Sequence, residues 1–562
     1  MSLALLAVAV LVVLALGYRL YGGFVARQYA LDDATTTPAE RLNDGVDFVP
    51  TRPFYLLGQH FSAIAAAGPI AGPIIAAQQF GWLPAVLWIL FGVVFIGAVH
   101  DLSTLIASVR HEGKSIAEVV KTNLGPRSGV AMMAFIWVAL IYVIVAFTDV
   151  TASTFVAGDP ELKGLHFDFN PGGAVAMAST LYLSLSVVMG LVERFLKPPL
   201  WLQTIVFVPG VLGVVWLGTK WSTVLAFGPT TWAVLILVYC FVASLTPVWA
   251  LLQPRGYLGG FVLYLALAIG TVGLFFGGFE VQLPAFKGFE VPGAGGALFP
   301  FLFVTIACGA CSGFHGLVCS GTTSKQIAKE SHCHPVGYGA MLLEGFVAVI
   351  ALATVMIISS EELAGKPAGT VYGIGLGRFF AVVLGQEHLP FAITFGAMAF
   401  STFVFDTLDV TTRLGRYIVQ ELTGLTGVVG SLVGTAVTVG LPMVFLIVAQ
   451  AGSWKTFWTL FGTSNQLLAA LSLMGVSVWL KRSGKRYWYT VAPMVFVSGV
   501  TLTSLVLQVR DAFFGAAVTT VQQVNGVVAV VLFGLAASLL TTGAKALLER
   551  PAAPVQPTGA TA

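Results

Sequence analysis

The sequence predicts an all-α polytopic membrane protein with about 15 transmembrane helices. Apolar residues make up 57% of its 562 residues and charged residues only 9%, where a soluble domain carries about 25% charged residues. A soluble fold cannot bury that much hydrocarbon, because its surface-to-volume ratio limits burial. These proportions, with a net charge of only +3, exclude a soluble enzyme, a secreted domain, a disordered chain and a nucleic-acid-binding protein.

Apolar runs of about 20 residues give the individual spans. A further apolar piece, 372–384, is too short to span and is expected to be re-entrant or interfacial. One transmembrane domain, 1–549, therefore takes nearly the whole chain, and the Pro/Ala/Thr-rich tail 550–562 is expected to be disordered in the cytoplasm. The predicted spans are 3–25, 58–79, 83–109, 129–157, 172–191, 200–217, 231–252, 257–276, 298–318, 336–358, 389–410, 425–448, 457–480, 489–506 and 526–544.

The basic residues predict the orientation of these spans. If the segment 26–57 is cytoplasmic and the loops then alternate, twenty of the 28 Lys and Arg residues, Arg255 included, fall on the cytoplasmic side and seven on the other. Cytoplasmic loops carry such an excess. The N-terminus is therefore expected outside and the C-terminus inside.

Glycine and proline interrupt two of the spans, and paired interruptions are typical of transporter substrate sites. The first is the run 68–73, Gly-Pro-Ile-Ala-Gly-Pro, where two Gly-Pro steps are expected to unwind the helix. The second is 308–316, with three glycines, a serine and a histidine. Non-helical backbone is tolerated in a membrane only where protein buries it or it lines a cavity. The competing interpretation is close helix packing through small residues.

Several ionisable side chains are predicted inside spans, where each is costly and therefore a candidate for function. The predicted orientation places all of them except Asp149 toward the cytoplasmic ends, which suggests an inner vestibule or gate. His60 and the pair His100–Asp101 are the first candidates for a proton relay, because His and Asp exchange protons near neutral pH when paired. The set is His60, His100, Asp101, Asp149, His315, Glu344, Asp406 and Asp409.

Asp406 and Asp409 also have a structural interpretation. Arg413 and Arg416 follow at i,i+4 and i,i+7, a spacing that suits ion pairs on one helix face.

The sequence patterns that could indicate a metal site are weaker than the pattern of ionisable residues in the spans. Five cysteines, an odd number, argue against a disulfide framework. The run His332-Cys333-His334 is a candidate for structural zinc, although adjacent ligands rarely share one tetrahedral ion. A membrane-embedded metalloenzyme built on this run and Glu344 would lack an HExxH-like spacing. We therefore expect no cofactor, with zinc at 332–334 as the alternative.

Motifs spread from Gly58 to about Tyr489 resemble the carbon starvation protein A (CstA) family. The position of His334 is more often Arg in that family. The motifs are GQHFSAIA at 58–65, GPIAGP at 68–73, SGFH at 312–315, SGTT at 320–323, the run 332–339, DTLD at 406–409, TRLGRY at 412–417 and GTSNQLLA at 462–469.

The resemblance implies a multi-pass transporter in a bacterial or archaeal inner membrane. Members are linked to peptide uptake during nutrient limitation, and close relatives take up pyruvate, with protons as the coupling ion. It also implies a LeuT-like inverted-repeat core of the amino acid–polyamine–organocation group. Six predicted spans separate the two broken helices where an ideal repeat has four, so extra peripheral helices are expected.

The function predicted is proton-coupled import of short peptides by alternating access. Pyruvate/proton symport is the alternative cargo, and a nutrient sensor without transport is the alternative of another class. The partners expected are the cargo and membrane lipid, with no nucleic acid. Substrate contacts are predicted for Gln59, His60, Gly68, Gly72, Gly309, Ser312, Gly313 and His315, and proton coupling or gating for His100, Asp101, Asp149, Asp406 and Asp409.

Overall fold

The structure is a computed structural model that describes residues 2–45, 47–156, 161–162, 165–290, 296–448, 454–515 and 518–549. The predicted tail 550–562 lies outside the described residues. The first half of the chain forms α1 (Leu3–Leu16), η1 (Gly17–Gly22), α2 (Gly23–Tyr29), α3 (Pro38–Arg41), α4 (Pro53–Ile64), α5 (Gly68–Phe80), α6 (Trp82–Gly92), η2 (Val93–Gly97), α7 (Ala98–Val109), α8 (Ile116–Leu124), α9 (Pro126–Val156), β1 (Glu161–Leu162), β2 (Leu165–His166), α10 (Pro171–Leu196), α11 (Leu200–Lys220), α12 (Pro229–Leu245), η3 (Val248–Ala250) and α13 (Leu252–Phe276).

The second half continues the helical pattern, with short helical turns between the longer helices. Its elements are α14 (Leu298–Thr305), α15 (Gly313–Cys319), η4 (Thr323–Gln326), η5 (Glu330–His332), η6 (His334–Gly339), α16 (Ala340–Met356), α17 (Ser360–Leu363), α18 (Ala368–Leu384), η7 (Gln386–His388), α19 (Leu389–Thr423), α20 (Gly427–Val448), α21 (Trp454–Arg482), α22 (Trp488–Phe514) and α23 (Thr520–Leu548).

Local sequence sets several helix ends. Asn170 accepts a hydrogen bond from the Gly173 N–H, and Pro171 fills the first position of α10. Thr519 and Gln522 form a capping box at the start of α23. In each case a side chain satisfies a backbone donor that the first turn of a helix leaves open.

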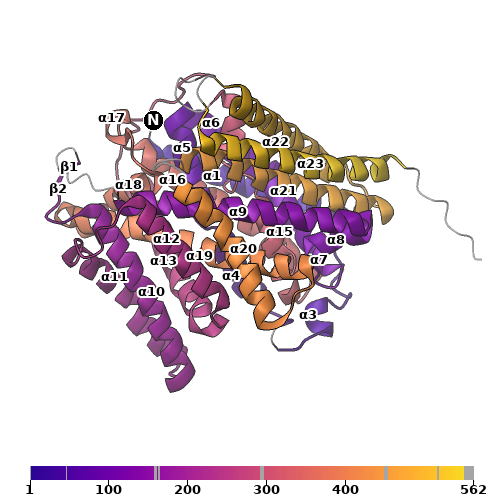
Figure 1. The fold of residues 1–562 in the computed structure, drawn as a ribbon, viewed down its shortest axis with the longest axis horizontal. Coiled ribbons are helices and arrows are strands. Elements are labelled where there is room, and N and C mark those ends of the chain that lie inside the picture. Colours follow the sequence, from indigo (N-terminus) through magenta and orange to yellow (C-terminus); the bar gives the residue numbers. More distant parts are fainter. Residues whose placement is uncertain are drawn as a thin grey trace, which may run out of the picture.

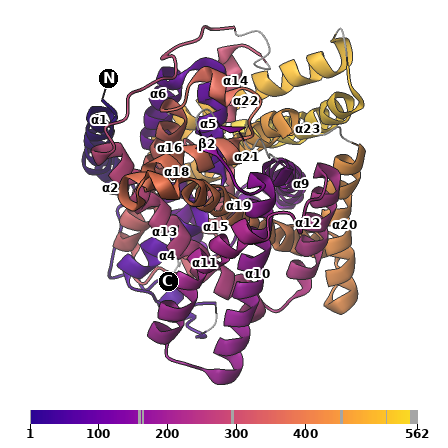
Figure 2. The same cartoon turned by 90° about the vertical axis from the view of Figure 1, so that its left-hand side faces the viewer.

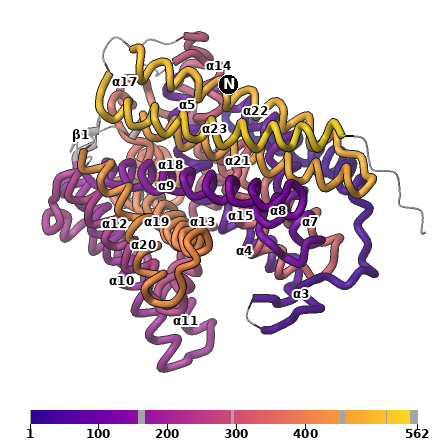
Figure 3. The backbone as a smooth tube through the Cα atoms, turned by 45° about the vertical axis from the view of Figure 1, so that its right-hand side comes forward, coloured from indigo at the N-terminus to yellow at the C-terminus, as the bar shows by residue number. Residues whose placement is uncertain are grey.

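Helix α9 is the central element of the fold. It packs against α8, α10, α12, α18, α19, α20, α21 and α23, and Figure 2 looks almost along its axis. The helices α22 and α23 run side by side along one edge, while α10 and α11 form a pair that projects at the opposite end (Figures 1 and 3). The site described below lies among α4, α7, α13, α15, α16 and α19.

The predicted all-α membrane architecture is confirmed in outline. Among the described residues, 11 helices are long and apolar enough to cross a membrane, or up to 12 if the bent pair of α4 and α5 is one span. Two-residue strands β1 and β2 form a small antiparallel ladder that was not predicted. The count of about 15 spans stays a prediction, because helices such as α12 and α18 are too short to pass the same test.

Two of the predicted boundaries place charged residues in loops that the structure puts in helices. Arg255 was counted in a cytoplasmic loop, but it lies inside α13 and is fully buried. Helix α19 continues to Thr423, so Arg413 and Arg416 belong to the helix rather than to the loop after it. A charged side chain usually ends an apolar run, but here Arg255 forms ion pairs inside the protein. Arg413 and Arg416 donate hydrogen bonds to backbone carbonyls.

Candidate functional site

The first break lies at residues 65–67, between α4 and α5, whose axes differ by 47°. The prediction that 68–73 unwinds is wrong, because Gly68 begins α5 and Pro69 sits in its first turn. A proline there costs little, since the first-turn N–H has no intrahelical partner anyway. The Gly-Pro step thus marks where the second half-helix starts.

The second break lies at residues 306–312, between α14 and α15. It overlaps the predicted 308–316, but Gly313 and His315 belong to α15 rather than to the unwound stretch. Both predicted spans are therefore broken, each about one turn before the position expected.

The two breaks lie side by side and are tightly packed. A Cβ added at Gly68 would lie 2.4 Å from Cys308 Sγ, and one added at Gly72 would lie 2.7 Å from the Thr305 carbonyl oxygen. Gly309 in turn lies next to Pro69. These glycines let the two broken helices meet at close range. Their predicted contact with the cargo stays a prediction.

Side chains satisfy the main-chain groups that the second break leaves open. The indole N–H of Trp88 donates to the carbonyls of Phe303 (3.2 Å) and Ile306 (3.1 Å). Trp458 donates to Thr305 O at 3.1 Å, and Gln466 donates to Phe303 O at 2.8 Å. Buried carbonyls are rarely left unpaired. The carbonyls of Phe303, Thr305 and Ile306 are therefore bound within the protein.

Asn465 on α21 caps the other side of this break. Its Oδ1 accepts from the Phe314 N–H at 2.9 Å, and its Nδ2 donates to Ser312 Oγ at 3.0 Å and Cys308 Sγ at 3.2 Å. The predicted substrate contact Ser312 is thus fully buried and engaged by Asn465. Gly313 packs against Asn465 O, where an added Cβ would lie at 2.4 Å.

A cavity of about 970 Å³ lies beside the first break. It begins at the exposed rings of Phe54 and Tyr55 and reaches Ala65 and Ala66 at the break. Of the eight predicted substrate contacts, only Gln59 lines it. Its other walls include Ser62 and Ala63 of α4, Gly256, Gly259 and Gly260 of α13, Phe314 and Val318 of α15, Leu343 of α16, and Phe403, Asp406 and Thr407 of α19.

The half-helices α4 and α15 separate this cavity from a buried polar cluster. On α15, Phe314 and Val318 face the cavity while His315 is only 1% exposed. On α4, Gln59 lines the cavity while His60 is likewise buried. The helical period of 3.6 residues puts neighbouring residues on different faces, so one half-helix serves both compartments.

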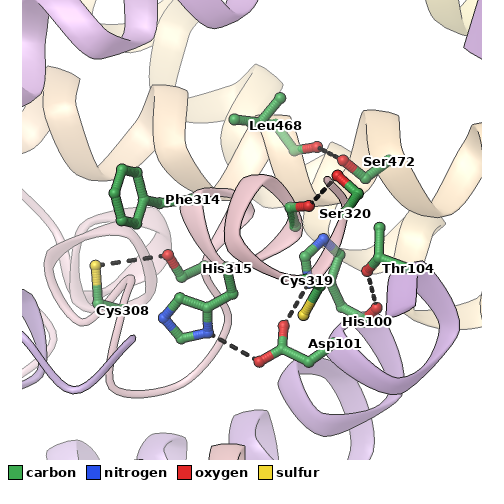
Figure 4. A network of polar contacts seen from close by, with 12 residues as sticks. His100, Asp101, Thr104, Cys308, Phe314, His315, Cys319, Ser320, Leu468 and Ser472 are labelled. Carbon is green, nitrogen blue, oxygen red and sulfur yellow. Dashed lines mark hydrogen bonds and ion pairs between the residues drawn. The ribbon is translucent and has the colours of Figure 1, made fainter. Parts of the chain in front are cut away.

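The buried cluster joins α7, α15 and α16. His315 Nδ1 lies 2.9 Å from Asp101 Oδ2, and His315 Nε2 lies 3.2 Å from Glu344 Oε2. His100 Nδ1 lies 2.7 Å from the other Asp101 oxygen. Figure 4 shows the Asp101 carboxylate between the His315 and His100 rings. The predicted His100–Asp101 contact is present, and His315 joins it instead of the cavity.

His60 lies at the edge of this cluster. Its Nδ1 is 2.9 Å from Thr323 Oγ1, and its Nε2 is 3.7 Å from Cys319 Sγ. One ligand atom each from His60, Asp101 and Cys319 lie within 4.8 Å of one another. Both Asp101 oxygens already face imidazole nitrogens, so hydrogen bonding accounts for the contacts of this group.

The predicted zinc run 332–334 has a different setting. Cys333 is buried, and the His334 ring stacks on Tyr18 with centroids 4.5 Å apart. Within the described part of the chain, three side chains that could bind a metal converge at His60, Asp101 and Cys319 and not at this run. Zinc at 332–334 stays a prediction.

A second charged group lies at the wall of the cavity. Arg255 Nη2 is 2.7 Å from Asp406 Oδ1, and Arg255 Nε is 3.1 Å from Asp409 Oδ2. The Tyr239 hydroxyl donates to Asp409 Oδ2 at 2.7 Å. The structural interpretation of these aspartates held that Arg413 and Arg416 pair with them. That interpretation is corrected, because both arginines donate to backbone carbonyls of residues 243–246 at the end of α12.

Asp149 stands apart from both groups. It is 7% exposed on the central helix α9, and its Oδ2 has no hydrogen-bond partner among the described residues. Its predicted role in coupling stays a prediction.

Just after the C-terminal end of α7, one ion pair and several hydrogen bonds join two loops. Arg110 Nε and Nη2 lie 2.8 and 2.7 Å from the two Glu330 oxygens. Hydrogen bonds from the backbone N–H and hydroxyl of Ser331 lower the pKa of Asp33. The loop after α2 is thereby fixed to the segment before α16.

Sequence reasoning did not assign Arg255, Asn465 or Tyr239. A signal existed for two of them: Arg255 is a lone charge between apolar runs, and Asn465 is a polar residue in an apolar helix. Both patterns mark polar groups that must find buried partners in a membrane protein.

Comparison with known proteins finds bacterial relatives that are each named as a transporter or symporter. The chain is 33% identical to the pyruvate/proton symporter BtsT of Escherichia coli, over 87% of this chain and 79% of that protein. It is 34% identical to the peptide transporter CstA of Campylobacter jejuni, over 88% and 79%. It is 32% identical to the peptide transporter CstA of Bacillus subtilis, over 97% of both chains.

Solved structures give more distant matches. A mutant manganese transporter of Eremococcus coleocola is 13% identical with a TM-score of 0.44, over 90% of this chain and 99% of that one. MhsT in complex with L-phenylalanine is also 13% identical with a TM-score of 0.44, over 85% and 98%.

The model of the family described as carbon starvation protein CstA matches residues 1–373 and 360–504. This match covers most of the chain, and the relatives above align over nearly all of it. The chain therefore belongs to the carbon starvation protein CstA family.

Proposed function

We propose that this protein is a secondary active transporter that imports short peptides across the inner membrane by alternating access, coupled to protons, during carbon limitation. The observation that carries the proposal is that two half-helices lie between the cavity and the buried histidine cluster. Helices α4 and α15 line the cavity on one face and bear His60 and His315 on the other. A movement of either half-helix that admits or releases cargo also changes the buried histidine cluster.

The cavity supports a peptide as cargo. Its volume of about 970 Å³ is at the upper end of the range of roughly 300–1,000 Å³ for pockets that enclose drug-sized ligands. A three-carbon acid would leave most of it empty. Pyruvate is kept as the second candidate because the relative BtsT is named a pyruvate/proton symporter.

The trio Asp101, His315 and Glu344 supports proton coupling. Both ring nitrogens of His315 face carboxylate oxygens. Satisfying both contacts requires an imidazolium, or a neutral ring with one protonated carboxyl. A proton can then move among three groups without leaving the cluster. His100 supports the trio from the far side of Asp101.

In the proposed transport cycle, this structure is the conformation whose cavity opens to the cytoplasm. The cavity mouth at Phe54 and Tyr55 follows the basic loop 26–52 that the charge pattern puts inside. Beyond the break, α18 packs against α5, α9, α13, α16 and α19, and Gly375 and Gly377 bring it against Thr354 and Ile393. The LeuT-like core with extra helices is part of this proposal.

Uptake into proteoliposomes tests the function. With a proton gradient directed inward, a labelled dipeptide should accumulate above equilibrium, and a protonophore should abolish the accumulation. Labelled pyruvate, measured in parallel, should accumulate less. Uptake of neither cargo would reject the transporter, and cargo binding without any flux would point to the sensor.

A further inference from the structure

We propose that Asp406 recognises a cationic amine on the cargo and thereby excludes acids that lack one. This inference rests on the proposed transport function and names the substrate class of the same cavity. The ion pairs of Arg255 join α13 to α19 beside this cavity.

The two carboxylates that contact the guanidinium of Arg255 differ in their exposure. Asp409 is 3% exposed and also accepts a hydrogen bond from Tyr239. Asp406 keeps 27% of its side chain exposed and lines the cavity. Arg255 itself is fully buried and does not line it. A cargo molecule therefore meets the Asp406 carboxylate and cannot reach the arginine.

Arg255 is shared between Asp406 and Asp409, so it neutralises an ionised Asp406 only in part. Arg413 adds positive charge near Asp409 and not near Asp406. Asp406 therefore keeps part of its negative charge. Among the described residues that line the cavity, Asp406 is the only Asp, Glu, Lys, Arg or His. An ammonium offsets that negative charge at close range, whereas a bare carboxylate adds to it.

The geometry leaves one oxygen of Asp406 available. Arg255 contacts Oδ1, while Oδ2 lies against Gly259, where an added Cβ would be only 2.7 Å away. Gly259 also lines the cavity. The absence of a side chain at position 259 thus gives Oδ2 room beside the cavity. A cargo ammonium bound there would form a charge-assisted hydrogen bond while Arg255 keeps its contact with Oδ1.

The test compares two cargoes that differ only at the amine. Wild-type proteoliposomes receive a labelled dipeptide with a free amino terminus or the same dipeptide N-acetylated. Hydrogen bonds to charged groups contribute enough for about a tenfold preference or more. We expect the wild type to prefer the free amine by this factor and Asp406→Asn to lose the preference.

Glu387→Gln is the control. It removes a carboxylate that is 72% exposed, does not contact Arg255 and does not line the cavity, so the ratio of free-amine to acetylated uptake should stay at the wild-type value. Asp409→Asn leaves Arg255 to neutralise Asp406 alone, so it should reduce the ratio as well. Gly259→Ala, which would push a methyl group against Oδ2, should reduce the ratio and serves if Asp406→Asn fails to fold.

The outcomes separate this inference from the transport function. If the wild type carries both dipeptides equally well, or if Asp406→Asn keeps the preference, the inference is overturned while peptide transport stands. If the wild type carries neither dipeptide, both fail. A wild type that carries pyruvate as readily as the free-amine dipeptide would also overturn the amine requirement.

Discussion

Glu344 is the residue on which proton coupling can be tested most directly. Its carboxylate pairs with His315 and makes no hydrogen bond to any other described residue. Glu344→Gln keeps the shape of the side chain but cannot carry a proton between two charge states. Coupling between two sites typically amounts to about 1–3 kcal/mol. Proton-driven accumulation of peptide should therefore fall on the order of tenfold, while exchange of internal for external peptide continues.

Glu387→Gln provides the control for this change. Its side chain is 72% exposed and its ion-pair contact is with the neighbouring His388 at 3.8 Å, so accumulation should match the wild type. Accumulation by Glu344→Gln at the wild-type level would remove the trio from the coupling mechanism.

At the scale of helices, the crossing of α5 with the second break depends on Gly72. A methyl group at this position would lie 2.7 Å from the Thr305 carbonyl oxygen, and a backbone atom cannot move aside cheaply. Overpacking of this kind costs about 1–3 kcal/mol. Gly72→Ala should lower the thermal unfolding temperature of the protein in detergent, and uptake with it.

Gly213→Ala is the matched comparison, because Gly213 lies inside α11 and an added Cβ there would meet nothing within 4 Å. Alanine in an open helix position removes the entropic cost of glycine, so this variant should unfold at the same or a higher temperature. Equal behaviour of the two variants would show that the crossing is not tightly packed.

The sequence allowed both broken helices to be located, but only to within a turn. Glycine and proline mark where a helix is interrupted, yet whether Pro69 ends one helix or begins the next depends on which backbone donors the neighbours can replace. Packing decides this, through contacts such as Gly68 against Cys308. These residues are far apart in the sequence, so local pattern alone could not supply the answer.

At the scale of the whole molecule, the cavity and its arginine could not be predicted. Arg255 and Asp406 lie on helices α13 and α19, and their pairing follows from how those helices pack. All eight ionisable residues predicted inside spans lie in helices, but Arg255 was missing from that set. Its pairing with the two aspartates at the cavity wall, apart from the cluster behind α15, was not predicted either. Helical spacing gives the face of each residue, while the partner of that face is a property of the fold.

The orientation of the whole molecule gives the last prediction. Ser62 lines the cavity and faces α13 near Gly260, whereas the five native cysteines are buried or half-buried. A membrane-impermeant maleimide should label Ser62→Cys faster from the cytoplasmic side than from outside, because the mouth at Phe54 and Tyr55 follows the basic loop. Bound dipeptide should slow the labelling by occupying the cavity.

Inside-out and right-side-out vesicles give the two rates, and the wild type gives the background from native cysteines. Faster labelling from outside would contradict either the assigned membrane orientation or the assignment of this structure as open to the cytoplasm. A second position separates these two outcomes: Ser483→Cys, in the basic loop after α21, should react only from the cytoplasmic side in every transport state.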